Sequence, residues 1–309
     1  FNGDGLDDFI IGYYAGDRYS LTDTGKAYVI YGRTSGASFT ATSMSASDGF
    51  RILGETTNDW SGYGVSGGQD VNGDGFDDLL IGQTASSTGQ AWVVFGASSL
   101  AELPSFNFAS PNTAQGFRMT ATGAGTFGTI SSAGDVNGDG LEDVIVGANS
   151  SDSNKGRGYV LFGRTTPSAA SVDLSMLNGT TGFVVTNTSG SASRIGSAVT
   201  GAGDINGDGF DDVLLGGPST GYSQATAVVF GASSFGASLD TSALDGTNGF
   251  VINGDIFYSN FGTALTFADL NGDGFDDPVI GARTDDGQDL HDSGITYVVY
   301  GADFKGTRV

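Results

Sequence analysis

A nine-residue pattern rich in aspartate recurs along the chain. Four complete copies begin at Asp70, Asp135, Asp204 and Asp269, and each reads Asp-x-Asn-Gly-Asp-Gly-x-Asp/Glu-Asp. A fifth copy at 1–8 contains the second to ninth residues of the pattern. Carboxylate, amide and carbonyl oxygens at this density suit Ca²⁺, which takes about six to eight oxygen ligands. The pattern therefore predicts five calcium-binding loops, with about one Ca²⁺ in each.

Each position of the pattern has an expected role. Positions 1, 3 and 5 should turn side-chain oxygens inward, position 7 should offer its backbone carbonyl, and position 9 should add a carboxylate. The residue at position 12 is apolar, as at Ile81, where an EF-hand has a bidentate Glu, so we expect β-hairpin loops and not EF-hands. The predicted ligands are Asn2, Asp4, Leu6, Asp8, Asp70, Asn72, Asp74, Phe76, Asp78, Asp135, Asn137, Asp139, Leu141, Asp143, Asp204, Asn206, Asp208, Phe210, Asp212, Asp269, Asn271, Asp273, Phe275 and Asp277. Outward, solvated charges are expected at position 8, which is Asp7, Asp77, Glu142, Asp211 and Asp276.

The charge of the chain agrees with a protein that binds cations. It has 35 acidic and 12 basic residues, for a net charge of −23, and more than half of the acidic residues lie in the five patterned segments. Such a surface repels nucleic acids and anionic membranes, which argues against both as partners. There is no cysteine and one histidine, His291, so thiolate sites and mechanisms that need several histidines are excluded. His291 lies in a polar segment that we interpret as a solvated loop, although a second metal site there is conceivable.

Short apolar runs flank every copy of the pattern. An aromatic or apolar residue and a glycine precede it, at Tyr63-Gly64, Phe127-Gly128, Ile195-Gly196 and Phe261-Gly262. An apolar run that ends in glycine follows it, at 9–12, 79–82, 144–147, 213–216 and 279–281. A second run comes later, at 27–32, 91–96, 159–163, 227–231 and 297–301, with a weaker strand signal at 49–52, 116–119, 182–185 and 249–252. These runs predict about four strands per repeat.

The apolar runs are continuous and do not alternate with polar residues, which indicates strands buried on both faces. Four-stranded antiparallel blades that pack between similar blades meet this requirement and leave only short sheet edges. The repeat length of 65 to 69 residues is long for a parallel β-helix, and no segment shows the period of a helical solenoid. The sequence therefore predicts an all-β protein, a β-propeller, in one domain over 1–309.

The repeats resemble the FG-GAP repeats of integrin α subunits and their bacterial relatives. The Phe-Gly element is present at 127–128 and 261–262, and degenerate forms of the Gly-Ala-Pro element stand at 147–148, 216–218 and 281–282. This resemblance implies calcium in the blade hairpins and a non-catalytic role in adhesion or recognition, secreted or at the cell surface. Integrin propellers have seven blades, whereas five repeats are visible here and the first begins mid-repeat. A complete five-bladed ring and a part of a seven-bladed ring both remain open.

The resemblance also implies where a partner approaches, because integrin ligands meet the face opposite the calcium hairpins. We expect a protein or glycan partner at the exposed aromatic and arginine residues of that face. The candidates are Tyr13, Tyr14, Arg18, Tyr19, Trp60, Tyr222, Phe257 and Tyr258. Two alternatives stay open: a structural subunit of a surface layer or filament that binds copies of itself, and a non-catalytic module of a larger secreted hydrolase or lyase. No apolar run is long enough for membrane insertion.

Overall fold

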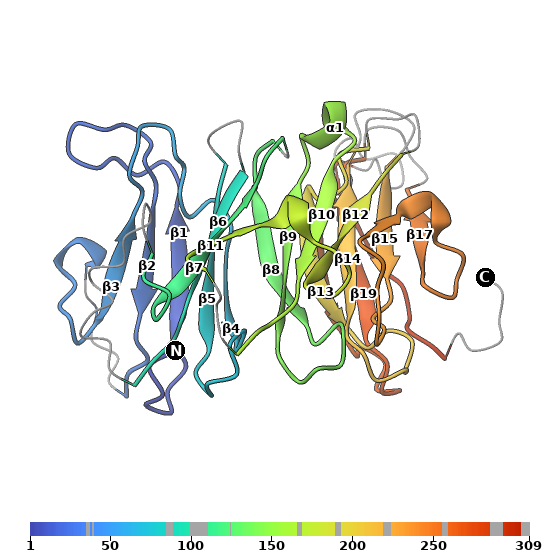
Figure 1. The fold of residues 1–309 in the computed structure, drawn as a ribbon, viewed down its shortest axis with the longest axis horizontal. Coiled ribbons are helices and arrows are strands. Elements are labelled where there is room, and N and C mark those ends of the chain that lie inside the picture. Colours follow the sequence, from blue (N-terminus) through green and yellow to red (C-terminus); the bar gives the residue numbers. More distant parts are fainter. Residues whose placement is uncertain are drawn as a thin grey trace.

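The computed structural model describes residues 1–34, 38, 40–84, 89–98, 111–123, 125–165, 169–188, 193–218, 224–254, 259–284 and 293–303. Nearly all regular structure in this part of the chain is β-strand, in five sheets that follow one another in sequence order. Figure 1 shows the strands standing roughly upright, with the first sheet (blue) at the left. The predicted all-β class is confirmed, and the sheets have the organisation of propeller blades.

The strands are grouped as follows. The first sheet has β1 (Phe9–Tyr13), β2 (Lys26–Ile30) and β3 (Gly49–Leu53). The second has β4 (Val65–Gln69), β5 (Asp78–Gln83), β6 (Gly89–Val94) and β7 (Gly116–Ala121), and the third has β8 (Thr129–Gly134), β9 (Asp143–Ala148), β10 (Arg157–Leu161) and β12 (Gly182–Thr186). The fourth has β13 (Ala198–Gly203), β14 (Asp212–Gly217), β15 (Ala225–Val229) and β17 (Gly249–Asn253), and the fifth has β18 (Phe261–Ala268), β19 (Asp277–Ala282) and β20 (Ile295–Val298).

Two short strands extend the sheets at their outer edges. β11 (Ser171–Asp173) pairs in parallel with β7, and β16 (Ser238–Asp240) pairs in parallel with β12, while the other strand pairs that the structure describes are antiparallel. Single helical turns occupy some of the connections, at η1 (Ala41–Ser43), α1 (Ser151–Asn154), η3 (Leu174–Met176) and η4 (Thr241–Ala243). β11 follows β10 of the third sheet but pairs with the second sheet, and β16 follows β15 of the fourth sheet but pairs with the third. Both strands therefore connect consecutive sheets.

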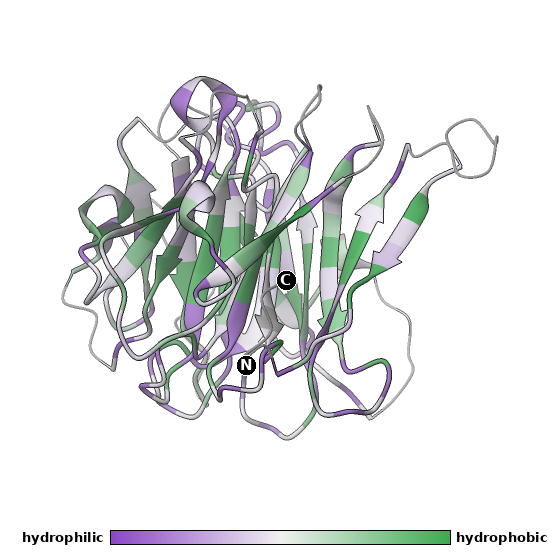
Figure 2. Cartoon of the chain, turned by 90° about the vertical axis from the view of Figure 1, so that its right-hand side faces the viewer, coloured by the Kyte–Doolittle hydropathy of each residue, from purple (hydrophilic) through white to green (hydrophobic). Residues whose placement is uncertain are grey.

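The apolar runs became strands buried on both faces, as their composition predicted. Every residue of β5, β9 and β14 is buried. Figure 2 shows hydrophobic colours concentrated on the strands and hydrophilic colours mainly in the segments that connect them. The glycine that ends each run allows close packing: a Cβ on Gly216 would collide with the carbonyl oxygen of Gly262, in the next sheet. The Phe-Gly element of one sheet and the glycine of the run in the preceding sheet thus meet at a close contact between two backbones.

Each sheet has one face toward the sheet that follows it in sequence, here called its forward face, and one toward the preceding sheet, its backward face. In the fourth sheet, Leu214 and Val228 lie on the forward face and pack with Leu265 of β18. Val213 and Leu215 lie on the backward face, in one buried cluster with the third sheet. The interior sheets therefore have both faces covered by their neighbours.

The two end sheets have one uncovered face each. Val298 of β20 takes the place in the repeat that Val228 takes in β15, yet 42% of it is exposed, against 0% for Val228. Ile11 of β1 corresponds to Leu215 of β14, and their exposed fractions are 47% and 0%. Among the described residues, buried clusters join each sheet to the next and none joins the fifth to the first. The sheets therefore form an open arc and not a closed five-bladed ring.

Candidate functional site

The five patterned segments, called the Asp loops from here on (1–8, 70–78, 135–143, 204–212 and 269–277), lie at one end of the sheets. The last four each join the first strand of a sheet to its second strand, β4 to β5 in the second sheet, for example. They gather at the lower end of the molecule in Figure 1. The repeat thus places one Asp loop per sheet on the same end of the arc.

The second Asp loop shows how the sequence builds the turn. The Asp70 carboxylate accepts backbone N–H bonds from Gly73 at 2.7 Å and from Gly75 at 2.8 Å. Asn72 Oδ1 accepts the N–H of Asp74 at 2.9 Å. Gly73 and Gly75 have φ angles of 74° and 87°, in the left-handed region that favours glycine. Both bonds have counterparts at Asp204 and Asp269, and the bond from Gly75 has one at Asp135.

The donor set of each loop consists of hard oxygen atoms. Asn72 Nδ2 donates to Asp74 Oδ2 at 3.0 Å, and the N–H of Asp74 donates to Asp70 Oδ1 at 3.1 Å. Positions 1, 3 and 5 therefore lie in one turn. Oxygen ligands of this kind fit Ca²⁺ and not the softer transition metals. Within the described ranges, no three carboxylate, imidazole or thiol side chains converge closely enough to hold a metal. Amide and main-chain carbonyl oxygens would therefore have to complete the coordination shell of an ion in these loops.

The aspartates at position 9 are buried and fasten the loop to the sheet. Asp78 accepts the N–H of Val71 at 3.0 Å and the N–H of Gly96 at 2.9 Å, so it joins the loop to the end of the third strand. The same pair of bonds recurs at Asp143, Asp212 and Asp277. Asp8 also accepts two N–H bonds, but the one from its own loop comes from Asn2, at position 3, and the other from Gly32. Burial raises the pKa of Asp78, Asp143 and Asp212 to about 8, although these N–H bonds act in the opposite direction. The structure gives these side chains a role in folding, and their role as ligands stays a prediction.

The prediction for position 8 was wrong for three of its five residues. Asp7 and Asp77 are exposed, but Glu142, Asp211 and Asp276 are only partly exposed. Asp211 Oδ2 accepts the N–H of Asp135 at 2.7 Å, and Asp276 Oδ2 accepts the N–H of Asp204 at 3.2 Å. Burial raises the pKa of Glu142 and Asp276 from the usual value. For Asp211 and Asp276 the donor belongs to the preceding sheet, which a single repeat does not reveal, while Glu142 accepts the hydroxyl of Ser132 in its own sheet.

Neighbouring Asp loops also contact each other through positions 4 and 7. The Phe76 ring covers Gly3 of the preceding loop so closely that a Cβ on Gly3 would collide with it, and Leu141 covers Gly73 in the same way. Phe210 and Phe275 repeat this contact on the glycines of the third and fourth loops. The residues predicted to offer position-7 carbonyls thus use their side chains to join one loop to the next.

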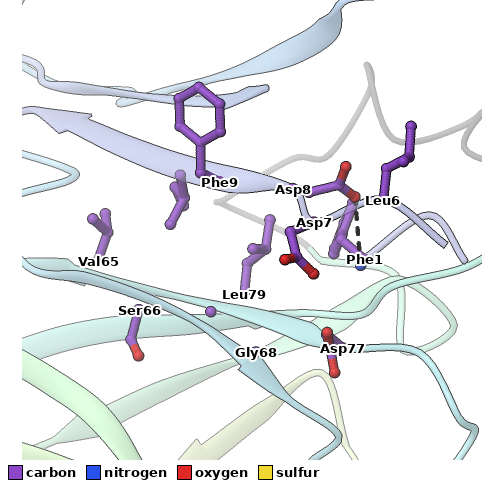
Figure 3. A pocket seen from close by; sticks show the side chains of 12 residues that line it. Phe1, Leu6, Asp7, Asp8, Phe9, Val65, Ser66, Gly68, Asp77 and Leu79 are labelled. Carbon is purple, nitrogen blue, oxygen red and sulfur yellow. Dashed lines mark ion pairs between the residues drawn. The ribbon is translucent and has the colours of Figure 1, made fainter. Parts of the chain in front are cut away.

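A cavity of about 430 Å³ lies between the first and second sheets, near the first Asp loop. Figure 3 shows Phe9 of β1 on one side of it, Val65 and Ser66 of β4 on the other, and Asp7 and Asp77 at one end. β1 follows an Asp loop, as β5 does, so the two strands correspond. β5 pairs with β6 on one edge and with β4 on the other. The first sheet has no described strand in that place, which accounts for the cavity.

The predicted partner-binding residues that the structure describes lie at the end opposite the Asp loops. Tyr14 contacts Trp60 with ring centroids 6.4 Å apart, and Tyr19 is 95% exposed. Arg18 is partly engaged, because its guanidinium donates to the carbonyl of Gly54 at 3.1 Å. Tyr13 instead ends β1 and belongs to the uncovered face of the first sheet. Outside the described residues lie Tyr222, Phe257, Tyr258 and His291.

Two features of this end were not identified from the sequence. Tyr63 packs on Tyr14 at 5.3 Å between ring centroids and is half exposed, whereas the sequence marked it only as the start of a strand. A polar cavity of about 230 Å³ lies beside the cluster, lined by Glu55, Asp59 and Arg118 among others. Only the fold brings Arg118 of β7 to the 55–61 segment, so no local pattern could have revealed this hollow.

Comparisons with known proteins identify the repeat. The model of the FG-GAP repeat family matches residues 61–94 and 127–161. Integrin alpha pat-2 of Caenorhabditis elegans is 29% identical over 239 residues, which are 74% of this chain and 18% of that protein. Integrin alpha-4 of Xenopus laevis is 29% identical over 160 residues, 52% of this chain and 14% of that protein.

A relative of another kind also matches. Phosphatidylinositol-glycan-specific phospholipase D of Dictyostelium discoideum is 32% identical over 112 residues, 32% of this chain and 12% of that protein. The chain spans less than a fifth of the length of these three relatives. Among the helices that the structure describes, none has the length and apolar character needed to cross a membrane.

Proposed function

The chain carries FG-GAP repeats of the integrin alpha kind, and from this premise we propose that it is an extracellular, non-catalytic recognition propeller stabilised by calcium. The observation that carries the proposal is the recurrence of one oxygen-rich loop at the same end of every sheet. The opposite end presents exposed aromatic side chains beside a polar hollow. Cation binding and partner recognition are thereby assigned to opposite ends of the blades.

Calcium is proposed at the five Asp loops, about one ion in each. Positions 1, 3, 5 and 9 would supply side-chain oxygens, with the carbonyl of position 7, as at Asp70, Asn72, Asp74, Asp78 and Phe76. The first loop supplies four of these five positions within this sequence. The loops already have the left-handed glycines and internal N–H bonds that hold a tight turn, which lowers the cost of ordering it around an ion.

The proposed ions are structural and not catalytic. In each complete loop four carboxylates lie within nine residues, and without a cation they repel one another. An ion would relieve this repulsion and stabilise the turn against which the next loop packs, as Leu141 packs on Gly73. Stability should therefore rise with calcium concentration, because only the folded loop presents the full ligand set.

Thermal unfolding in calcium, in magnesium and in chelator tests this proposal. We expect calcium to raise Tm and the Asp74→Ala variant to reduce the rise, since Asp74 would be lost as a ligand. Asp59→Ala is the matched control, because Asp59 is a partly exposed carboxylate at the opposite end, where it accepts N–H bonds from Glu55 and Thr56. A Tm that does not respond to calcium, or that responds equally in both variants, would contradict calcium binding at the loops.

The proposed partner is an extracellular protein that binds at the Tyr14, Trp60 and Tyr63 cluster. All three side chains are between 39% and 50% exposed, and the Tyr14 ring contacts the other two, which gives a compact aromatic surface. Aromatic anchors of this kind carry much of the energy in protein interfaces. The adjoining hollow with Glu55, Asp59 and Arg118 offers charged groups of both signs for orientation.

Binding to an array of extracellular proteins and glycans tests the recognition surface. We expect binding to one or more proteins and its loss in the Tyr14→Ala/Trp60→Ala double variant, with Met176→Ala as the exposed control at another place. Binding that both variants retain would contradict this surface, and binding to glycans alone would replace a protein partner with a sugar.

A second candidate function has one observation in its favour. The similarity to a phospholipase D from Dictyostelium discoideum covers 32% of this chain at 32% identity. A propeller of this kind could serve as the non-catalytic module of a larger hydrolase. Lipase or phosphodiesterase activity in a longer product that contains these residues, together with its absence from residues 1–309 alone, would favour this candidate.

A further inference from the structure

The polar hollow beside the aromatic cluster contains one cationic and one anionic side chain that have no partner among the described residues. We propose that it binds a small zwitterion, a free α-amino acid, whose carboxylate contacts Arg118 and whose ammonium group contacts Glu55. This ligand is additional to the proposed calcium ions and to the proposed protein partner, and its binding requires neither of them.

Two consecutive sheets and the connection between them form the hollow. It is lined by the 55–61 segment, which joins β3 to β4, and by side chains of β5, β6 and β7. Trp92 of β6 supplies its apolar part and packs in the buried cluster between the first and second sheets. The lining residues therefore all lie between 55 and 118, on and beside the backward face of the second sheet.

Arg118 carries a charge that no described carboxylate neutralises. It faces Trp92 across β6 and β7, which places both side chains on the same face of the sheet, and it is partly exposed. Its Nε atom is buried without a hydrogen-bond partner, and none of the ion pairs in the described part of the chain includes it. A partly desolvated, unpaired guanidinium costs free energy, which a carboxylate at its other N–H groups would offset.

The two carboxylates that line the hollow differ in what they already bind. Asp59 accepts the N–H of Glu55 at 3.0 Å, the N–H of Thr56 at 2.6 Å and the hydroxyl of Thr56, so its oxygens hold their own turn together. The carboxylate of Glu55 is partly exposed and has no hydrogen bond or ion pair to a described residue. Glu55 is therefore the carboxylate that is available to an ammonium group.

The neutral side chains of the hollow fit the same kind of ligand. Gln83 is only 5% exposed and Gln90 is partly exposed, and neither side-chain amide is hydrogen-bonded within the described part of the chain. An amide both donates and accepts, so it can bind either charged group of a zwitterion. The volume of about 230 Å³ is below the range of about 300–1,000 Å³ for drug-sized ligands, which favours a small molecule.

The charges also select against simpler ions. An anion alone would pair with Arg118 but would lie near Glu55 and Asp59, which repel it. A cation alone would pair with Glu55 and leave Arg118 without a partner. A zwitterion satisfies both free groups at once, so it should bind more tightly than either of its halves.

The chain has two tryptophans, and they report on two different places. Trp92 lines the hollow, whereas Trp60 belongs to the aromatic cluster and does not line it. Fluorine NMR of residues 1–309 labelled with fluorotryptophan therefore tests the proposal, and Trp60→Phe assigns the two signals. We expect glycine, L-alanine or L-serine to shift the Trp92 signal to saturation and to leave the Trp60 signal in place. Acetate and methylammonium at the same concentrations should shift it little.

Two variants remove one charge each. Arg118→Gln and Glu55→Gln should each weaken amino-acid binding at least about tenfold, because each loses a charge-assisted contact. Both should keep the Tm of the wild type in calcium, since neither charged group has a described partner. Arg51→Gln is the matched control, because Arg51 is exposed in β3 and does not line the hollow.

Four results would overturn the proposal. They are a Trp92 signal that none of the three amino acids shifts to saturation, an equal response to acetate alone, undiminished binding in Arg118→Gln or Glu55→Gln, and equal shifts of both tryptophan signals. The last result would place the ligand outside the hollow.

Discussion

Val228 in β15 and Val298 in β20 occupy the same place in two copies of one repeat, but one is fully buried and the other is 42% exposed. The residues are identical, and both are preceded and followed by apolar residues. The difference lies in the next sheet, which covers Val228 and has no described counterpart beyond Val298. In a repeat protein, a neighbouring repeat therefore decides whether an apolar residue stabilises the fold or remains an exposed surface.

The same contrast holds for the Asp loops. In the fourth loop Ile205 is buried and Gly207 lies beneath Phe275, while in the fifth loop Leu270 is exposed and Gly272 is open. The local hydrogen bonds are nearly the same in both: Asp204 and Asp269 each accept the N–H of the glycine three residues later at 2.7 Å. The sequence of each loop thus sets its local turn geometry. Whether the loop is buried depends on the next sheet.

The largest expected effect comes from placing a charge at the two matched valines. Val228→Asp buries an unpaired carboxylate in a closed apolar cluster and should cost more than about 4 kcal/mol of unfolding free energy. Val298→Asp leaves the carboxylate in contact with water and should cost less than about 0.5 kcal/mol. Urea unfolding in calcium, at a concentration where the chain is monomeric, measures both. Similar losses in the two variants would mean that the fifth sheet is covered in solution.

The buried aspartates of the interior loops should make the calcium-free protein sensitive to pH. The pKa of Asp78, Asp143 and Asp212 is about 8 when folded, well above the usual value, because they are buried. Between about pH 4 and pH 8 the folded chain then binds more protons than the unfolded chain at these groups, so its stability falls as pH rises. Calcium, which favours the ionised carboxylates, should weaken this dependence.

Urea unfolding in metal-depleted buffer at several pH values, and again with calcium, measures this dependence. Asp78→Asn removes one of the three titrating groups and should reduce the slope without abolishing it. A calcium-free protein whose stability rises steadily from pH 4 to pH 8 would contradict the assigned burial.

The smallest expected effect compares two glycines in the loops. Gly207 and Gly272 have φ angles of 72° and 77°, so alanine at either costs about 1 kcal/mol in backbone strain. Gly207→Ala must also displace the Phe275 ring, which adds about 1–3 kcal/mol. Gly272→Ala meets open space and should show only the first cost. Equal losses in urea unfolding would show that the loop-to-loop contact contributes nothing to stability.

Much of the fold could be predicted from the sequence, because the signals are local. Apolar runs that end in glycine became strands such as β9 and β14, and their continuous composition indicated burial on both faces, which is confirmed. The Asp loops were found in full, because the order of residues in one segment fixes the turn. The strands β11 and β16 were not predicted, since three residues with a single apolar side chain, such as Val172, give no periodic signal.

The residues that the sequence did not predict correctly are those that contact another sheet or another repeat. Asp211 looks like a solvated charge within its own loop, and only the third sheet provides the N–H that it accepts. Tyr63 looks like the start of a strand, and only the 14–25 segment brings Tyr14 to it. The uncovered ends of the arc were equally hidden, since Phe9 and Ile11 read as an ordinary buried run. Contacts between repeats therefore mark the limit of what this sequence predicts.

Native mass spectrometry of residues 1–309 after equilibration with calcium tests whether the Asp loops bind this ion. We expect about five bound calcium ions, one per Asp loop, and one fewer in Asp208→Ala and in Asp273→Ala. The Asp59→Ala control should keep the full number, because Asp59 lies at the opposite end. If the chain bound no calcium at the millimolar concentrations typical of extracellular sites, or if the two variants lost none, calcium binding at the Asp loops would be wrong.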